Sequence, residues 1–191
     1  MRKLLFVLAL SVLAMGVSAQ KLVGNVGQMR GQKEVNLVID FTGVTVSGKS
    51  EESYIENETK AKTDEEKEKW LKGWNEDLRT RAYAKFASEF NKFINDEFYK
   101  IGDFPSAEYT INLKVINIVP GHFAGPVSKS PVLTTKVTFV KKGEETPFGT
   151  MDYKKMTAVI YEIPVLSERV ANAFGTHGMQ LARGLNSYLK K

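Results

Sequence analysis

The sequence contains no cysteine at all. A bacterial lipoprotein carries its acyl chains on a cysteine, so direct lipid anchoring is excluded. Secreted eukaryotic domains commonly use disulfide bonds, so an exported chain without cysteine points to a bacterial envelope. Without cross-links, burial alone must stabilise the fold, and a chain of 191 residues suffices for one hydrophobic core.

Catalytic signatures are equally scarce. Histidine, the commonest acid-base residue, occurs only as His122 and His177. The chain has no Gly-x-Ser-x-Gly elbow, Walker-type phosphate loop, paired-histidine zinc motif or calcium loop. We therefore predict no catalytic, cofactor-binding or metal-binding residues. An envelope hydrolase whose carboxylates meet only in the fold stays open as the least favoured alternative, because such residues leave no motif in a sequence.

Long apolar runs are absent except for one, from Leu4 to Val17. This run is shorter than the roughly 20 residues that cross a bilayer. It follows Arg2 and Lys3 and ends in Val17-Ser18-Ala19, the small residues that a signal peptidase requires. We therefore predict a signal peptide over residues 1–19, a mature protein in the periplasm or outside the cell, and no transmembrane segment after cleavage.

The chain also has only a small excess of positive charge. The net charge is +5, and removal of Arg2 and Lys3 with the signal peptide reduces it to +3. A surplus this small, without arginine clusters or interleaved aromatic residues, is typical of a solubilising surface. We predict no nucleic-acid partner.

The mature N-terminus, residues 20–34, contains Gly24, Gly27 and Gly31, which predicts a flexible arm. From Val35 to Phe41 apolar residues alternate with others, which predicts a strand with one buried face. We expect ordered structure to begin with this strand.

Two helices follow from the spacing of apolar residues. Thr63 and Glu66 form a capping box, which starts a helix that we expect to end near Ile101. Its apolar stripe is Leu71, Trp74, Leu78, Ala82, Phe86, Phe90 and Phe93. Ser167 is the predicted cap of a last helix. The glycines of that helix, Gly175, Gly178 and Gly184, indicate close packing of the helix on a sheet.

Residues 109–115 alternate as a second strand, and Ile116 with Ile118 predicts that its end is covered on both faces. A third strand has Leu133 to Phe139, and one or two more follow. A helix between the first two strands allows a parallel crossover, whereas short turns make the later strands antiparallel. We therefore predict that residues 35–191 form one α+β domain. It would be a two-layer sandwich, with two amphipathic helices on one face of a mixed sheet of four to five strands.

Three stretches resemble a group of envelope proteins: Val35–Phe41, Ser106–Val115 and the glycine-bearing last helix. The group comprises relatives of the N-terminal domain of the Tol translocation protein and of the periplasmic domain of the curli-secretion lipoprotein. Outer-membrane activators of penicillin-binding proteins look similar. This chain lacks their lipid-modified cysteine, a propeller domain and long hairpins. The resemblance implies a non-enzymatic module for protein contacts in the Gram-negative periplasm.

Two segments are candidates for such contacts. One is the loop from Pro120 to Pro126, whose glycines and prolines are typical of a shaped, exposed turn. The charged segment from Glu51 to Lys69 is the other. Tryptophans are favoured interface anchors; Trp74 is in register with the apolar stripe and is predicted as core, whereas Trp70 lies toward its edge. The candidate interface residues are Trp70, Pro120, Gly121, His122, Phe123, Gly125 and Pro126.

The leading hypothesis is thus a periplasmic protein-binding module whose partner is another envelope protein. An alternative is a carrier of a small apolar ligand between helix and sheet, lined by Phe86, Phe90 and Phe93. His177, inside a predicted helix, is expected to be a packed or helix-surface residue. The sequence leaves the partner's identity and the oligomeric state open.

Overall fold

The computed structural model describes residues 21–125, 127–158 and 163–190. The predicted signal peptide, residues 1–19, and the candidate residue Pro126 lie outside the described residues. Among the described residues, no helix is both long enough and apolar enough to cross a bilayer.

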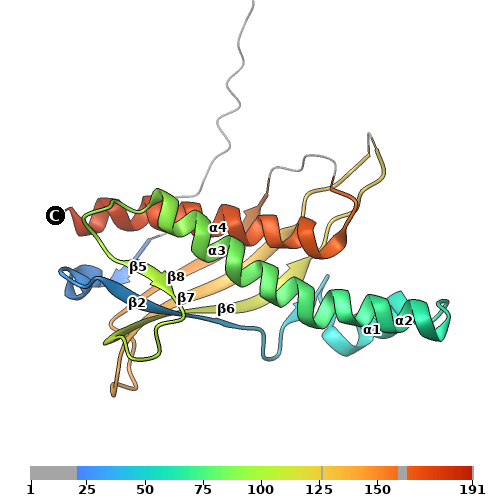
Figure 1. The fold of residues 1–191 in the computed structure, drawn as a ribbon, viewed down its shortest axis with the longest axis horizontal. Helices are drawn as coiled ribbons and strands as arrows, with labels where there is room; N and C mark the ends of the chain where they lie inside the picture. The colour runs from blue at the N-terminus through green and yellow to red at the C-terminus, as the bar shows by residue number, and fades with distance from the viewer. Residues whose placement is uncertain (1–20, 126, 159–162, 191) are drawn as a thin grey trace, which may run out of the picture.

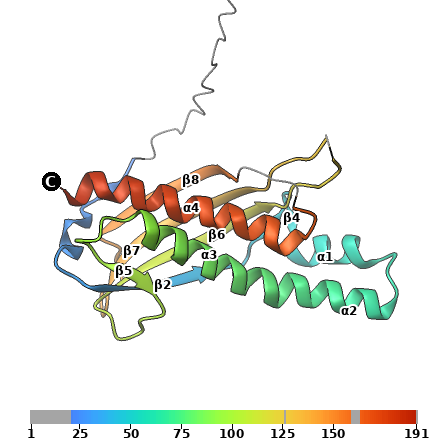
Figure 2. The ribbon, with the colours of Figure 1, turned by 45° about the horizontal axis from the view of Figure 1, so that its top comes forward.

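An eight-stranded mixed sheet forms one layer and helices α3 and α4 lie side by side on one of its faces (Figures 1 and 2). The strands are β1 Val23–Gly24, β2 Glu34–Asp40, β3 Thr45–Val46, β4 Lys49–Ser50, β5 Lys100–Gly102, β6 Tyr109–Val119, β7 Val132–Lys141 and β8 Gly149–Thr157. The helices are α1 Glu51–Thr59, α2 Asp64–Lys72, α3 Leu78–Phe93 and α4 Leu166–Leu189. The α+β class with a mixed sheet is confirmed. The predicted sheet of four to five strands is too small, because β1, β3, β4 and β5 are too short to show alternation.

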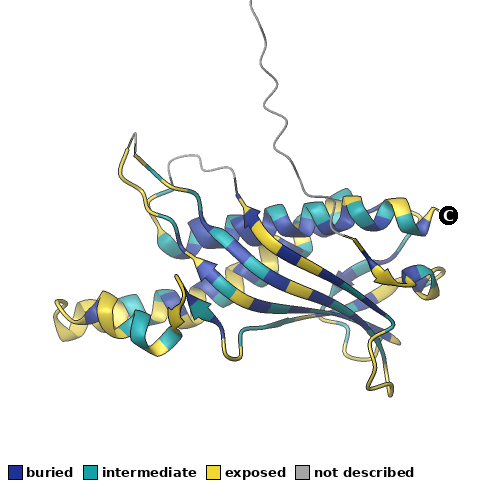
Figure 3. Ribbon diagram, turned by 180° about the vertical axis from the view of Figure 1, so that it is seen from behind, coloured by how far each residue is buried: buried dark blue, intermediate teal, exposed yellow. Residues whose placement is uncertain are grey.

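The pairing follows the predicted topology. β2 runs parallel to β6, with Leu37 opposite Ile111, and β6, β7 and β8 are antiparallel. Residues on one side of these strands are buried under the helices, whereas the other side is striped with exposed residues (Figure 3). The prediction that Ile116 is covered was wrong, because a bulge between Val115 and Asn117 leaves its side chain 44% exposed.

The first long helix begins as predicted, with Thr63 and Glu66 in a capping box. It runs through α2, a π-helical stretch from Gly73 to Asp77 and α3. It ends at Phe93 and not near Ile101, because Ile94 is extended, with φ −71° and ψ 146°. The chain then returns to the sheet as β5, parallel to β2.

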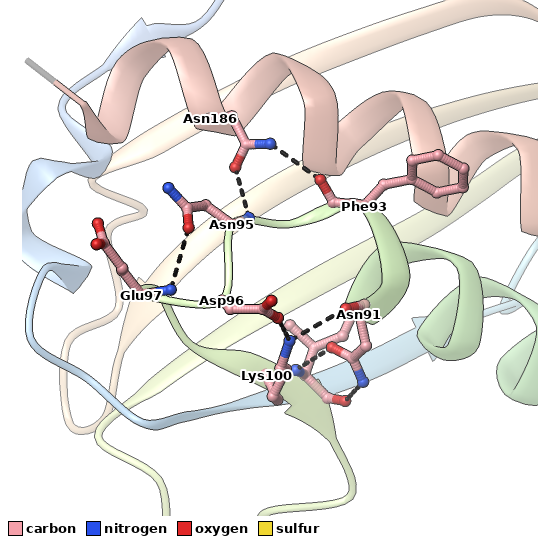
Figure 4. A network of polar contacts seen from close by, with 8 residues as sticks. Asn91, Phe93, Asn95, Asp96, Glu97, Lys100 and Asn186 are labelled. Atoms are coloured by element: carbon pink, nitrogen blue, oxygen red, sulfur yellow. Dashed lines mark hydrogen bonds and ion pairs between the residues drawn. The ribbon is translucent and has the colours of Figure 1, made fainter.

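At this turn, asparagine side chains form hydrogen bonds with backbone groups that a continued helix would have paired (Figure 4). The amide of Asn186 donates to the Phe93 carbonyl oxygen at 2.9 Å and accepts from the Asn95 backbone N–H at 3.0 Å. The amide of Asn91 bonds both the N–H and the carbonyl of Ile101, each at 2.8 Å. The turn is therefore joined to α4 and to β5 by hydrogen bonds that stand in for the helical ones.

We expect the Asn91→Ala variant to lose about 1 to 2 kcal/mol of unfolding free energy, because the Ile101 N–H is left without its acceptor in a buried position. Urea denaturation measures this loss. The matched control is Asn57→Ala, whose exposed amide bonds only the Ser53 carbonyl of its own helix. Equal losses in the two variants would contradict the role assigned to Asn91.

The N-terminal segment is not the flexible arm that its glycines predicted. Asn25 caps a short 3-10 helix, Val26–Met29, and the side chains of Val26 and Met29 are buried in the core. The guanidinium of Arg30 donates to the carbonyls of Tyr188 and Leu189 at the end of α4. Burial of these apolar side chains offsets the entropy cost of ordering a glycine-rich segment.

Helix α4 starts at Leu166, with Val165 as an N-cap that makes no side-chain hydrogen bond. The predicted cap, Ser167, is instead buried in the first turn. The glycines serve mainly helix-on-helix packing and not the predicted packing on the sheet. A Cβ at Gly178 would overlap the Phe86 carbonyl oxygen of α3, whereas a Cβ at Gly184 would meet only the Met151 methyl group, at 3.9 Å.

Candidate functional site

Two segments project from the same end of the molecule, one above the other in Figures 1 and 2. One is the loop that joins β6 to β7, which we call the hairpin, residues 120–131. The other is the pair of helices α1 and α2, which we call the arm, residues 51–72. Together they form what we call the hairpin end. The two segments that the sequence marked for contacts thus lie at one end of the fold.

The hairpin has a defined shape. Gly121 has a φ of 66°, and a Cβ there would overlap the Lys129 carbonyl oxygen, so only glycine fits. His122 and Lys129 form an antiparallel bridge with hydrogen bonds of 3.1 and 2.9 Å. Ser128 Oγ accepts from the Ala124 N–H and donates to the Gly125 carbonyl. These contacts hold the described residues of the loop in one shape within the chain itself.

Arg169 of α4 holds the base of the hairpin. Arg169 is 5% exposed, and its guanidinium donates to the carbonyl oxygens of Pro120 at 3.2 Å, Ile163 at 2.9 Å and Pro164 at 3.0 Å. Burial lowers the pKa of this guanidinium. The sequence analysis missed Arg169, because carbonyl acceptors leave no pattern in a sequence.

An aromatic cluster forms the base of the arm. Trp70 and Trp74 stack with ring centroids 5.7 Å apart, and Tyr54 of α1 lies against both. Glu51 accepts from Trp74 Nε1 at 2.8 Å and pairs with Arg79 at 2.9 Å. Burial is the largest cause that raises the pKa of Tyr54, to about 12. Trp74, 1% exposed, is confirmed as a core residue.

Most of the exposed large apolar residues lie in segments at or beside the hairpin end. Seven large apolar residues are exposed among the described residues, and five of them lie on the hairpin, on the adjoining end of β6 or at the start of α4. These five are Ile116, Val119, Phe123, Val127 and Val165. A concentration of exposed apolar residues at one end of a molecule is typical of an interaction surface, whereas singly scattered ones are ordinary.

The other predicted site residues differ in exposure. His122, Phe123 and Gly125 are exposed, and Gly121 is half-buried. Pro120 is buried against Arg169. Trp70 is half-buried within the aromatic cluster, so only part of its ring can meet a partner.

Nothing in the core favours the apolar-ligand alternative. Phe86 and Phe90 are fully buried, with Phe86 edge-on to His177 and Phe90 stacked on Tyr99. Phe93 lies beneath Arg183, whose guanidinium carbon is 4.6 Å from the ring centroid. Two surface hollows of about 300 and 290 Å³ follow the seam between α3 and α4, and none of these phenylalanines lines them.

The buried histidine is a packed residue and not an exposed acid or base. Burial lowers the pKa of His177 to about 3, so the ring is neutral at physiological pH. Its Nδ1 lies 3.5 Å from Thr135 Oγ1, and its Nε2 has no hydrogen-bond partner among the described residues. No group of three or more potential metal-ligating side chains occurs in the described parts of the chain.

The carboxylates with lowered pKa are structural. The hydrogen bond that the Lys114 ammonium donates to Asp40, 2.7 Å long, is the largest cause that lowers the pKa of Asp40, to about 2. Hydrogen bonds within the capping box lower the pKa of Glu66. Neither residue lines a hollow described above, so neither supports the hydrolase alternative.

Comparison with known proteins gives weak likenesses only. No family model matches the chain, and no curated protein matches it. A PelC dodecamer from Paraburkholderia phytofirmans is 9% identical with a TM-score of 0.38, covering 87% of this chain and 96% of that one. A neuraminyllactose-binding hemagglutinin homologue from Helicobacter pylori is 12% identical with a TM-score of 0.35, covering 88% and 92%. Scores this low say nothing about what the chain binds, and the resemblance to Tol and curli-secretion proteins stays a prediction.

Proposed function

We propose that this protein is a non-enzymatic binding module of the bacterial cell envelope that contacts another envelope protein through the hairpin end. The observation that carries the proposal is that most of the exposed large apolar residues among those described lie at or beside this end, with Phe123 and Val127 on the hairpin itself. The predicted signal peptide supports the envelope as the compartment.

The hairpin is also suited to binding because hydrogen bonds within the chain already hold its described residues in place. The Arg169 hydrogen bonds and the bridge between His122 and Lys129 fix the position of the hairpin. A preordered loop loses little conformational entropy on association, so more of the contact energy appears as affinity. Phe123 is therefore the expected anchor of the contact.

A photo-crosslinking amino acid at position 123 tests the proposal in cells that express the full chain with its own N-terminal segment. We expect it to capture the same envelope protein in repeated experiments, and the same probe at Glu145 to capture little. Glu145 is the matched position because it is equally exposed but lies in the β7–β8 turn, at the other end of these strands.

The Phe123→Asp/Val127→Asp double variant should then lower recovery of that protein roughly tenfold or more, because both substitutions place charges in an apolar contact. Val38→Asp is the control, since Val38 is also exposed, at 41%, but lies on β2. Absence of any captured envelope protein at position 123, or equal recovery with all variants, would refute the proposed function.

A further inference from the structure

We infer that the hairpin end also binds the hairpin end of a second copy of this chain, forming a two-fold symmetric dimer in which each hairpin lies on the partner's arm. The inference rests on the proposed function in one respect, namely that the hairpin end is a protein-binding surface. It names a partner for that surface from the distribution of charge.

The hairpin side of this end is basic. From Ile116 to Lys136 the chain contains no acidic residue, and Lys129 is exposed on the hairpin. Lys154 and Lys155 are exposed on β8, close to where Met156 and Thr157 pair with the base of the hairpin. None of these three lysines forms an ion pair with another described residue.

Within the arm, helix α1 presents the opposite charge, whereas α2 carries both acidic and basic residues. Helix α1 contains four glutamates and no basic residue. Glu51 is used internally by Trp74 and Arg79, but Glu52, Glu56 and Glu58 are exposed and have no ion-pair partner among the described residues. Tyr54 and Ile55 lie half-buried between them and give the same helix apolar contact area.

The position of the two surfaces makes the end self-complementary. The hairpin and the arm project in one direction but are separated across the end, and all three views of the fold agree on this (Figures 1, 2 and 3). A two-fold axis between them places each hairpin on the partner's arm, so that residue i contacts j and j contacts i. The same two-fold rotation pairs the basic hairpin side of each chain with the acidic α1 of the other, and it covers Phe123 and Val127 in both chains.

Sedimentation velocity of the mature chain, at about 10 to 100 μM protein, tests this inference. We expect a dimer that weakens when salt rises from about 0.05 M to about 0.5 M, since exposed ion pairs are screened. Lys129→Glu and Glu56→Lys should each weaken the dimer roughly tenfold or more, because each reversal turns two symmetric attractions into repulsions.

The decisive sample is an equimolar mixture of the two variants. Each variant repels itself at both contacts, whereas the mixed pair has opposite charges at both, so the mixture should dimerise when neither variant does. Lys142→Glu, the same change in the β7–β8 turn, is the control and should behave as the parent. Circular dichroism establishes that each variant is folded.

A monomer at every concentration and salt, a dimer insensitive to both reversals, or a mixture that stays monomeric would each overturn the inference. These failures are distinct from failure of the proposed function. A purified chain that is monomeric while position 123 still captures another envelope protein in cells removes the dimer and leaves the binding module. If the purified chain is a dimer and the probe at position 123 captures only a second copy of the chain in cells, the dimer stands and the contact with another envelope protein is refuted.

Discussion

Replacing Gly178 with alanine is expected to lower the free energy of unfolding by about 3 kcal/mol. The Cα of Gly178 faces the backbone of α3, where an added Cβ would overlap the Phe86 carbonyl oxygen and lie 3.1 Å from the carbonyl carbon. Backbone atoms cannot rotate away as the end of a side chain can. Helices α3 and α4 would therefore separate, and the edge-on contact between Phe86 and His177 would loosen.

Gly184→Ala is the matched control for this variant. It lies in the same helix, and its added Cβ would meet only the Met151 methyl group at 3.9 Å, an ordinary contact distance. Alanine favours a helix by about 1 kcal/mol over glycine, so this variant should be as stable as the parent or more stable. Thermal and urea unfolding of both variants measure the difference. A Gly178→Ala protein as stable as Gly184→Ala would show that α3 and α4 are not in close contact at this position.

Stability should also fall steeply in mild acid because of His177. Burial lowers the pKa of this ring from 6.5 to about 3, so between these values the unfolded chain binds a proton that the folded chain does not. The contribution is fully present above pH 6.5 and is lost as the pH falls toward 3. The slope approaches about 1.4 kcal/mol per pH unit, which amounts to about 2 to 3 kcal/mol between pH 6.5 and 4.5.

Urea unfolding across this range measures the slope, and the His177→Leu variant should remove most of it whatever its own stability. Working above pH 4.5 avoids the range in which Asp40 takes up its proton, below its ordinary pKa of 3.8. His122→Gln is the control, since that side chain is exposed on the hairpin. A slope unchanged in His177→Leu would mean that the folded protein already protonates His177 near its ordinary pKa.

The long elements were predictable because their apolar residues repeat. In β7 the alternating residues Leu133, Val137 and Phe139 are all fully buried, as predicted, and the capping box at Thr63 does start its helix. Both patterns are local, since each depends on side chains within a few residues of one another. The end of the helix at Phe93 was not predictable, because the amides that hold the turn come partly from Asn186 in another helix.

The candidate site was predictable in part. Glycines and prolines identified the hairpin as a shaped loop, and Gly121 does require its positive φ. The sequence contained no sign that Arg169 anchors the hairpin, or that the arm lies at the same end, because both follow from how α4 and the sheet pack. The placement of Ile116 outside the core likewise depends on a bulge in pairing with β7.

The sequence by itself determined the α+β class, the antiparallel strands after β6 and the buried face of each long element, and it allowed the parallel crossover from β2 to β6 that the structure has. Tertiary structure alone decided the number of strands, the packing of the N-terminal segment on the core, the contact of Gly178 with α3 and the placement of hairpin and arm at one end of the fold. The physical reason is the range over which each feature is determined. Periodicity and capping act within one or two turns of chain, whereas these features depend mainly on segments far apart in the sequence that come together only when the core packs.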